Sequence, residues 1–206
     1  MGIASDEQFR VLHALRIKGF AKCDVLGELS GLPPSNVESH LADLQGEELT
    51  LFREARALWQ LTPKGREVHG VRLSADVGQT GFRDVLHANY DHFLALNEGF
   101  KALCGDWQLK DGAHNDHSDA KYDKGVVERL LDLDKQARPI VLGMGDGVDR
   151  FSGYAPRLAD TAKRVAKGES NLFTGVMCGS YHDIWMELHE DLILSLGIDR
   201  AKEGSF

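Results

Sequence analysis

The first third of the chain alternates between helical and strand-like spacing of its apolar residues. Apolar side chains recur every three or four positions in Phe9–Ile17, Val25–Leu29 and Val37–Leu44, which is the spacing of amphipathic helices. Gly31-Leu-Pro-Pro34 separates the second helix from the third, because proline cannot continue a helix. The spacing then changes to that of two short strands around a charged tip, Arg53–Arg56. The pattern therefore predicts helix, helix, turn, helix and β-hairpin.

The third predicted helix begins at Ser35, whose hydroxyl group can cap it, with Glu38 three residues later to complete a capping box. Its polar residues then face away from its apolar residues: Ser35, Asn36, Ser39, His40 and Asp43. Thr62 and Pro63 follow the hairpin and open a further helix that runs to about Asp76, in the favoured order of cap and then proline.

Two segments resemble a known family. Leu61-Thr-Pro-Lys-Gly-Arg-Glu-Val68 is similar to the Leu-Thr-x-x-Gly pattern that closes the wing of MarR-type transcriptional regulators, and Leu44-Gln-Gly-Glu-Glu-Leu49 resembles the end of their recognition helix. The resemblance covers residues 8–76 and implies a winged helix-turn-helix that binds double-stranded DNA. It implies that Ser35, Asn36, Ser39 and His40 face the major groove and that Arg53 and Arg56 lie at the wing tip. A winged helix that contacts another protein is the alternative for this segment.

The chain as a whole is acidic, and only a basic patch near the hairpin favours DNA binding. The chain has a net charge of −8, and residues 1–80 hold 9 of its 24 basic and 11 of its 32 acidic side chains. Because binding to DNA depends on neutralising phosphates, the positive groups must be concentrated in one place. The predicted third helix has no Lys or Arg, but the hairpin region offers a patch made of Arg53, Arg56, Lys64 and Arg66.

A glycine-rich segment, Gly78–Gly81, predicts the boundary between two domains, a winged helix in residues 1–78 and a helical domain in residues 82–206. Long helical patterns dominate the second domain, and their short connections predict an antiparallel bundle. We expect four helices: one of about 25 residues from Phe82, one from Tyr122 that is broken near Pro139, Tyr154–Lys167 and Asn171–Leu196. The predicted fold class is mostly α, with an α+β N-terminal domain and an all-α C-terminal bundle.

Aromatic and histidine side chains in the second domain predict an effector site. They supply both apolar walls and directed polar groups, as a ligand pocket needs. The candidates for contact with a small-molecule effector are Tyr90, Phe93, Trp107, Tyr181, His182, Trp185 and His189. A divalent metal is the alternative occupant, and its candidate ligands are His87, His92, His114, His117, His182 and His189. Histidines at the margin of an apolar helix face are also typical of cores and subunit contacts. The helix order and the histidines resemble the FCD domain of GntR-type regulators, which implies a small carboxylate bound through a metal.

An apolar run that ends in the turn Gly143–Gly147 suggests a competing function. A strand that feeds a glycine turn is typical of nucleotide-like cofactor sites, so the alternative is an enzyme. That alternative requires a strand at Ile140–Leu142, whereas the helical flanks favour a glycine-containing helix connection.

The remaining features predict a cytoplasmic protein. The three cysteines include no Cys-x-x-Cys pair, which fits a reducing compartment better than a disulfide framework. No apolar run approaches the ~20 residues of a membrane span, and we expect neither a signal peptide nor a membrane partner. We expect a ligand-responsive transcriptional regulator that is not an enzyme. We also expect a homodimer that pairs through helices 82–104 and 171–196 to place two recognition helices on DNA.

Overall fold

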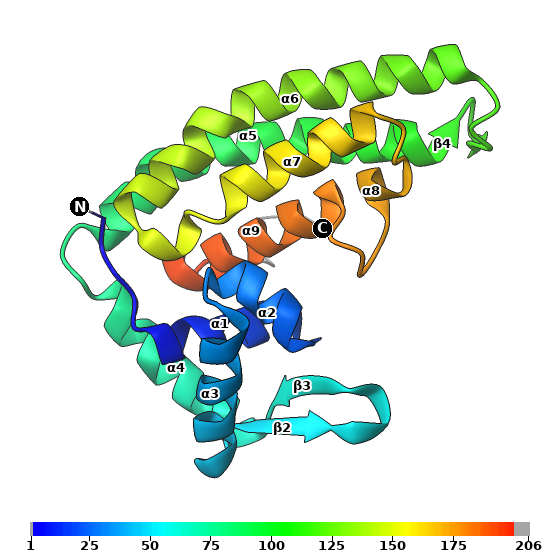
Figure 1. The fold of residues 1–206 in the computed structure, drawn as a ribbon. Helices are drawn as coiled ribbons and strands as arrows, with labels where there is room; N and C mark the ends of the chain where they lie inside the picture. The colour runs from blue at the N-terminus through cyan, green and yellow to red at the C-terminus, as the bar shows by residue number, and fades with distance from the viewer. Residues whose placement is uncertain (1, 200–206) are drawn as a thin grey trace.

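The structure is a computed structural model that describes residues 2–199, and it is mostly helical, as predicted (Figure 1). The N-terminal half contains α1 (Glu7–Lys18), β1 (Phe20–Ala21), α2 (Cys23–Ser30), α3 (Pro34–Gly46), β2 (Thr50–Arg53), η1 (Glu54–Arg56), β3 (Leu58–Leu61) and α4 (Pro63–Val77). The C-terminal half contains α5 (Phe82–Gln108), β4 (Leu109–Lys110), β5 (Ala113–His114), α6 (Ala120–Gly147), η2 (Asp149–Phe151), α7 (Tyr154–Ala166), α8 (Asn171–Thr174) and α9 (Tyr181–Leu196). No helix within residues 2–199 is long and apolar enough to cross a membrane.

The N-terminal half packs three helices against a small antiparallel sheet of strand order β1-β3-β2. Leu12, Leu26 and Leu41 come from α1, α2 and α3, and all three are fully buried in one apolar cluster. The predicted hairpin is formed by β2 and β3, whose register places Phe52 opposite Trp59. Figure 1 shows this hairpin extending away from the rest of the molecule.

The segment that closes the hairpin folds as its sequence predicts. The Thr62 hydroxyl accepts a hydrogen bond from the Gly65 backbone N–H (2.9 Å) and caps α4. A Cβ atom at Gly65 would collide with the backbone carbonyl of Leu49, at the start of the hairpin. The glycine of the Leu-Thr-x-x-Gly pattern is therefore needed because helix and strand backbones touch there.

In this half one local prediction is wrong, and the structure adds two features that the sequence did not predict. Helix α3 begins at Pro34 because the fixed φ of proline suits the first helical position, so Ser35 lies inside the helix and is not its cap. The hairpin tip is a 3₁₀ turn, η1, that ends at Ala57 in the left-handed region (φ 50°). Strand β1 was not predicted, because its two residues are too few to show an alternating pattern.

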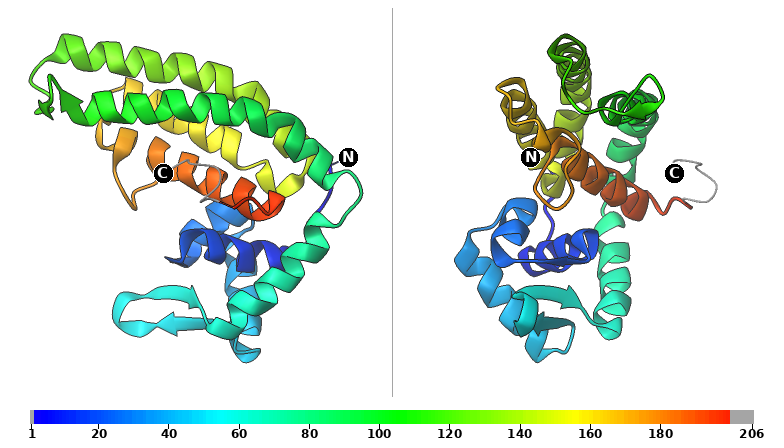
Figure 2. Two further views of the ribbon diagram at one scale, coloured as in Figure 1. Left: turned by 180° about the vertical axis from the view of Figure 1, so that it is seen from behind. Right: turned by 90° about the vertical axis from the view of Figure 1, so that its right-hand side faces the viewer.

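In the C-terminal half, α5 and α6 are long helices packed side by side, and α7 and α9 lie beneath them (Figure 2). Helix α6 contacts α7, and α9 contacts both α5 and α7. Helix α4 ends at Val77 and α5 begins at Phe82, so the segment Gly78–Gly81 is the connection between the two halves.

Two helix predictions in this half were wrong. Helix α6 continues through Pro139, because Val141 and Met144 beyond it are buried between neighbouring helices and offset the lost backbone hydrogen bond. The last helix is divided into α8 and α9, with Ser180 capping α9 and Gly179 in the left-handed region just before it. The connection between α5 and α6 contains the short antiparallel pair β4-β5, which the sequence did not predict.

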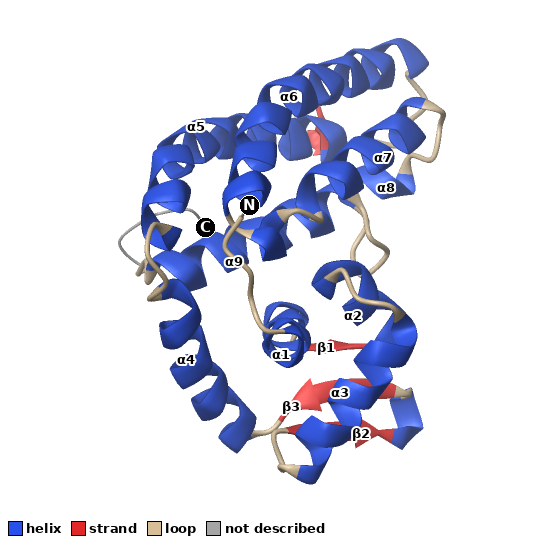
Figure 3. Cartoon of the chain, turned by 60° about the vertical axis from the view of Figure 1, so that its left-hand side comes forward, coloured by secondary structure: helices blue, strands red, loops and turns tan. Residues whose placement is uncertain are grey.

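The two halves meet along α9. Figure 3 shows α1 and α4 on one side of α9, and both helices contact it. The extreme N-terminal segment also crosses the boundary, because the Ile3 backbone N–H donates to the Gly147 carbonyl (2.8 Å) and its carbonyl accepts from the Asp149 N–H (3.0 Å).

Candidate functional site

The outer face of α3 presents the polar residues that the sequence assigned to DNA. Ser35, Asn36 and Ser39 are exposed and His40 is half-buried. Glu7 of α1 reaches this face, because its carboxylate accepts a hydrogen bond from Asn36 Nδ2 (3.5 Å) and lies 3.4 Å from His40 Nε2. The structure therefore brings these α3 residues together on one surface and adds an acidic neighbour.

The hairpin tip carries exposed cations. Arg53 and Arg56 form no ion pair with any residue that the structure describes. They line a surface hollow of about 360 Å³. Lys64 is engaged, because its Nζ atom donates to the Glu47 carbonyl (2.8 Å) and pairs with Glu48 (3.1 Å). The cations of this region without ion pairs among the described residues are thus Arg53 and Arg56 at the tip and Arg66 in the first turn of α4.

Most of the predicted effector residues lie in the apolar core. The rings of Phe93 and Trp185 stack with their centroids 5.0 Å apart, and Tyr181 stacks on Trp185 at 6.0 Å. The Trp185 indole N–H donates to Asn97 Oδ1 (2.9 Å). Tyr90 and His189 are also buried, and His182 is half-buried beside Phe100.

Trp107 is separate from this group and contacts Phe173 and His117. The predicted residues therefore fill space with each other, and a ligand among them would have to displace packed rings.

The candidate metal ligands do not converge. Within residues 2–199 no group of three His, Cys, Asp or Glu side chains could hold a metal ion. His117 instead pairs with Asp123 (3.0 Å) in the connection before α6. Likewise, the strand that the enzyme alternative requires is not present, since Ile140–Leu142 are helical.

The glycines near the end of α6 permit close packing. A Cβ atom at Gly145 would lie 2.8 Å from the Ser152 Cα atom, and one at Gly147 would overlap the side chain of Val85. The glycine-rich segment therefore lets α6 approach η2 and α5, and it does not form a phosphate-binding turn.

The structure also contains a polar network that the sequence did not reveal, buried where α1, α4, η2 and α9 meet. Arg150 is its centre: its Nε atom donates to Asp76 Oδ2 (3.1 Å), and Nη1 forms an ion pair with Asp191. Nη2 of Arg150 donates to the Ser195 hydroxyl. The Tyr154 hydroxyl donates to the second oxygen of Asp191 (3.1 Å). Hence one guanidinium from the C-terminal half joins α4 to α9.

Two histidines from the N-terminal half complete this junction network. His13 Nε2 lies 3.0 Å from Asp191 Oδ1, and His13 Nδ1 lies 2.9 Å from His69 Nε2. An ionised Asp191 can only accept, so this contact favours a proton on His13 Nε2, with Nδ1 accepting from His69. The Arg150 Nη1 donor lies 3.2 Å from the same Nε2 and favours the other tautomer. The two imidazole rings are stacked, and the Phe9 ring stacks on His69.

Burial and charge determine the protonation of this network. Burial lowers the pKa of His13, and burial lowers the pKa of His69 to about 3. Burial alone would raise the pKa of Asp191, but the charge of Arg150 and hydrogen bonds from His13 and Arg150 hold it below its ordinary value. At neutral pH the network thus has the Arg150 cation, an ionised Asp191 and two neutral histidines. Apart from Ser195, which donates to Asp191 within α9 (3.0 Å), its partners are far apart in sequence, which is why no spacing indicates the network.

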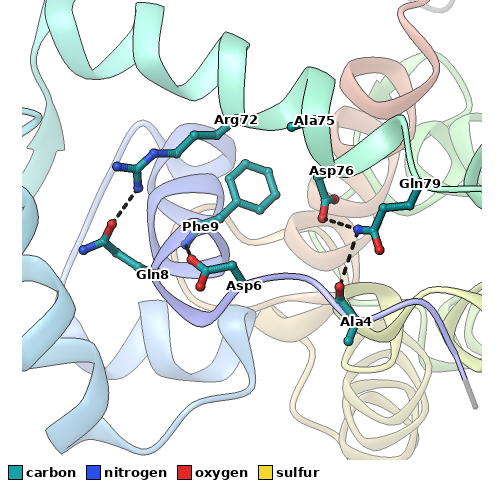
Figure 4. Close-up of a pocket in the computed structure, with 8 residues that line it drawn as sticks. All are labelled: Ala4, Asp6, Gln8, Phe9, Arg72, Ala75, Asp76 and Gln79. Atoms are coloured by element: carbon teal, nitrogen blue, oxygen red, sulfur yellow. Dashed lines mark hydrogen bonds between the residues drawn. The ribbon is translucent and has the colours of Figure 1, made fainter.

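Two further clefts flank the junction. One of about 500 Å³ lies between the start of α1 and the end of α4, and Figure 4 shows its lining. There Arg72 Nη1 donates to Gln8 Oε1 (2.6 Å), and Gln79 Nε2 donates to Asp76 Oδ1 (3.2 Å). Arg72 Nη2 also pairs with Glu47, just beyond the end of α3 (3.2 Å). The second cleft, of about 460 Å³, opens on the other side of the junction, between α2 and α9.

Comparisons with known proteins give no relative for this chain. No protein-family model matches it, and neither a curated protein nor a solved structure does.

Proposed function

We propose that this chain is a sequence-specific DNA-binding transcriptional regulator in which α2, α3 and the β2-β3 hairpin act as a winged helix-turn-helix of the MarR-like kind. One observation carries the proposal: the exposed polar face of α3 lies in the same half as a projecting hairpin whose tip holds two cations without ion-pair partners among the described residues. A helix of this kind fits the major groove of B-DNA, and the hairpin tip can reach the adjoining phosphates.

The side chains divide into two roles. Asn36 and His40 can form hydrogen bonds with base edges, and Ser35 and Ser39 lie beside them on the same helix. Arg53 and Arg56 neutralise phosphates and supply affinity without sequence preference, as Lys64 does once it leaves Glu48. Glu7 restrains the first group, because DNA must compete with its carboxylate for Asn36 and His40.

A second copy of the chain completes the DNA-binding unit. One recognition helix covers only a few base pairs, and a two-fold axis places a second helix about one turn of DNA away. In a single chain the apolar face of α9 is already covered, since Ile184, Trp185 and Leu188 are buried. We therefore assign the pairing of the two copies to outer surfaces of the C-terminal half and not to the apolar face of α9.

The test is selection of duplexes from a random DNA library by the full chain, followed by gel-shift titration of the selected sequence at several salt concentrations. The variant R53E/R56E should bind all sequences more weakly, and the slope of log affinity against log salt should fall by ~2. The control K121E/K124E makes the same change of charge on exposed residues at the far end of α6 and should bind as the wild type does. Selection of no sequence would refute the proposal and favour a protein-binding winged helix.

A further inference from the structure

The cleft between α2 and α9 has the features of a ligand-binding site. It is bounded on one side by the end of α1, β1 and α2, and on the other by α7, residues 177–179 and α9. Its volume of about 460 Å³ lies within the range of small-molecule pockets. Figure 1 shows the connection between α8 and α9 extending toward α2.

The floor of the cleft is cationic. Glu187 is buried, and its two carboxylate oxygens accept from Lys18 Nζ (2.6 Å) and Arg157 Nη2 (2.8 Å). Two cations thus share one carboxylate. Moreover, Arg157 Nη1 is buried and has no acceptor among the residues that the structure describes. An acceptor of negative charge, such as a carboxylate, suits this floor.

The opposite wall is acidic on balance, and the rim is apolar. Asp24 and Glu28 line the cleft from α2, Lys22 lines it just before this helix, and all three are exposed. Asp183 also lines it, but its carboxylate accepts the backbone N–H groups of Cys178 and Gly179 (2.9 and 3.1 Å) and so shapes the connection. At the rim, Phe20 and Met177 are 46% and 74% exposed, which is unusual for side chains this apolar.

We propose that this cleft binds a small apolar amino acid in its zwitterionic form. The carboxylate lies on Arg157 and Lys18, the ammonium group faces Asp24 and Glu28, and the side chain packs against Phe20 and Met177. A ligand with both charges matches the two walls of the cleft, and its apolar group covers exposed rim surface.

Binding of this kind would regulate the chain. The ligand touches both halves, and α2 leads directly into α3, so occupancy fixes α2 relative to α9 and favours one placement of α3. This consequence rests on the proposed function, whereas the binding itself does not.

Cys178 lines the cleft and provides the readout. It is the exposed cysteine of the three. Burial raises the pKa of the Cys104 thiol to about 12 and also raises the pKa of Cys23, so a maleimide reacts first with Cys178. Alkylation of the full chain by N-ethylmaleimide, followed residue by residue by mass spectrometry, therefore reports occupancy of this cleft.

Three probes separate the chemical requirements: phenylalanine, 3-phenylpropanoate without the ammonium group, and phenethylamine without the carboxylate. Phenylalanine should slow alkylation of Cys178 in a saturable manner. Each singly charged probe should need a concentration at least ~10-fold higher to protect Cys178 to the same extent. The proposal is overturned if phenylalanine gives no protection up to ~10 mM, or if 3-phenylpropanoate protects as well as phenylalanine does.

Variants locate the site. Arg157→Gln should abolish protection, whereas Arg164→Gln makes the same change on an exposed residue of α7 and should retain it. If Arg157→Gln fails to fold, Phe20→Ala provides the test, because this exposed side chain can be shortened without opening the core. Phenylalanine should then protect Cys178 less well than in the wild type. Unchanged protection in both cleft variants would refute the assignment.

The same samples in the DNA titration separate the two proposals. Protection of Cys178 in a chain that selects no DNA would uphold the site and refute the proposed function. Selected DNA without protection would do the reverse.

Discussion

Acidification should weaken the junction between the two halves, and His69 allows the size of the effect to be worked out. Its pKa is about 3 in the folded chain, against an ordinary value of 6.5, because burial opposes its charge. Above pH 6.5 both folded and unfolded chains hold it neutral. As the pH falls below 6.5 only the unfolded chain binds the proton, so the free energy of unfolding decreases until the pH approaches 3.

At pH 5 the unfolded chain gains about 2 kcal/mol from protonating one such histidine, relative to pH 7. His13 adds a loss of the same sign, because burial lowers its pKa as well. Asp191 does not contribute in this interval, because its pKa lies below the ordinary value of 3.8 and its stabilising effect is lost only at more acid pH. The wild type should therefore lose at least about 2 kcal/mol between pH 7 and pH 5 from this site.

The assay is urea denaturation at both pH values. The slope of the unfolding free energy against urea concentration should be the same at both, which checks that unfolding is two-state. His69→Gln keeps an amide donor toward His13 but cannot titrate, so its loss of stability between pH 7 and 5 should be smaller by about 2 kcal/mol. His87→Gln, at an exposed histidine of α5, is the matched control and should lose as much as the wild type. If His69→Gln loses as much as the wild type, the buried histidine pair does not govern the junction.

Three further changes test the same structure. Arg150→Met leaves Asp76 and Asp191 buried without their cation and should lower the free energy of unfolding by about 3–5 kcal/mol, as measured by urea denaturation. The control Arg129→Met removes an exposed pair with Asp106 and should lower it by under about 1 kcal/mol. Equal losses in the two variants would contradict the network. Gly147→Ala forces a Cβ atom against Val85 and should destabilise by about 1–3 kcal/mol, while Gly125→Ala meets open space and should be neutral or stabilising by thermal denaturation. Glu7→Gln removes the charge that competes for Asn36 and His40 and should tighten binding to the selected DNA several-fold in gel-shift titration; weaker binding would mean that Glu7 positions these residues for DNA.

Local chemistry made part of this fold predictable. Thr62 caps α4 through a hydrogen bond with the Gly65 N–H, and Gly65 lets the helix approach Leu49 because it has no side chain. Both effects depend on residues within one short segment, so the sequence of that segment predicts its structure. Pro139 shows the limit, because the helix continues past it only through burial against helices that are distant in sequence. Propensity is a local preference that packing overrides.

The candidate sites divide in the same way. The residues on the outer face of α3 follow from helical period alone, and the structure places them together on one exposed surface. The aromatic residues of α9 have the composition of a pocket lining, but composition does not distinguish a ring that lines a cavity from one that fills it. The contact between His13 and Asp191 spans 178 positions, and no short pattern contains both.

The path of the N-terminal segment constrains how the chain folds during its synthesis. Ile3 pairs with Val148, and Phe9 belongs to the apolar cluster of the C-terminal half. These early residues leave the ribosome long before their partners do. His13 Nδ1 can pair with His69 of the same half, but His13 Nε2 must wait for Asp191, near the end of the described chain. The first half can therefore form its own small core while its far side stays open. The junction forms through long-range contacts that become available only late in synthesis, so we expect the apolar surface around Phe9 to stay exposed until the C-terminal half is made.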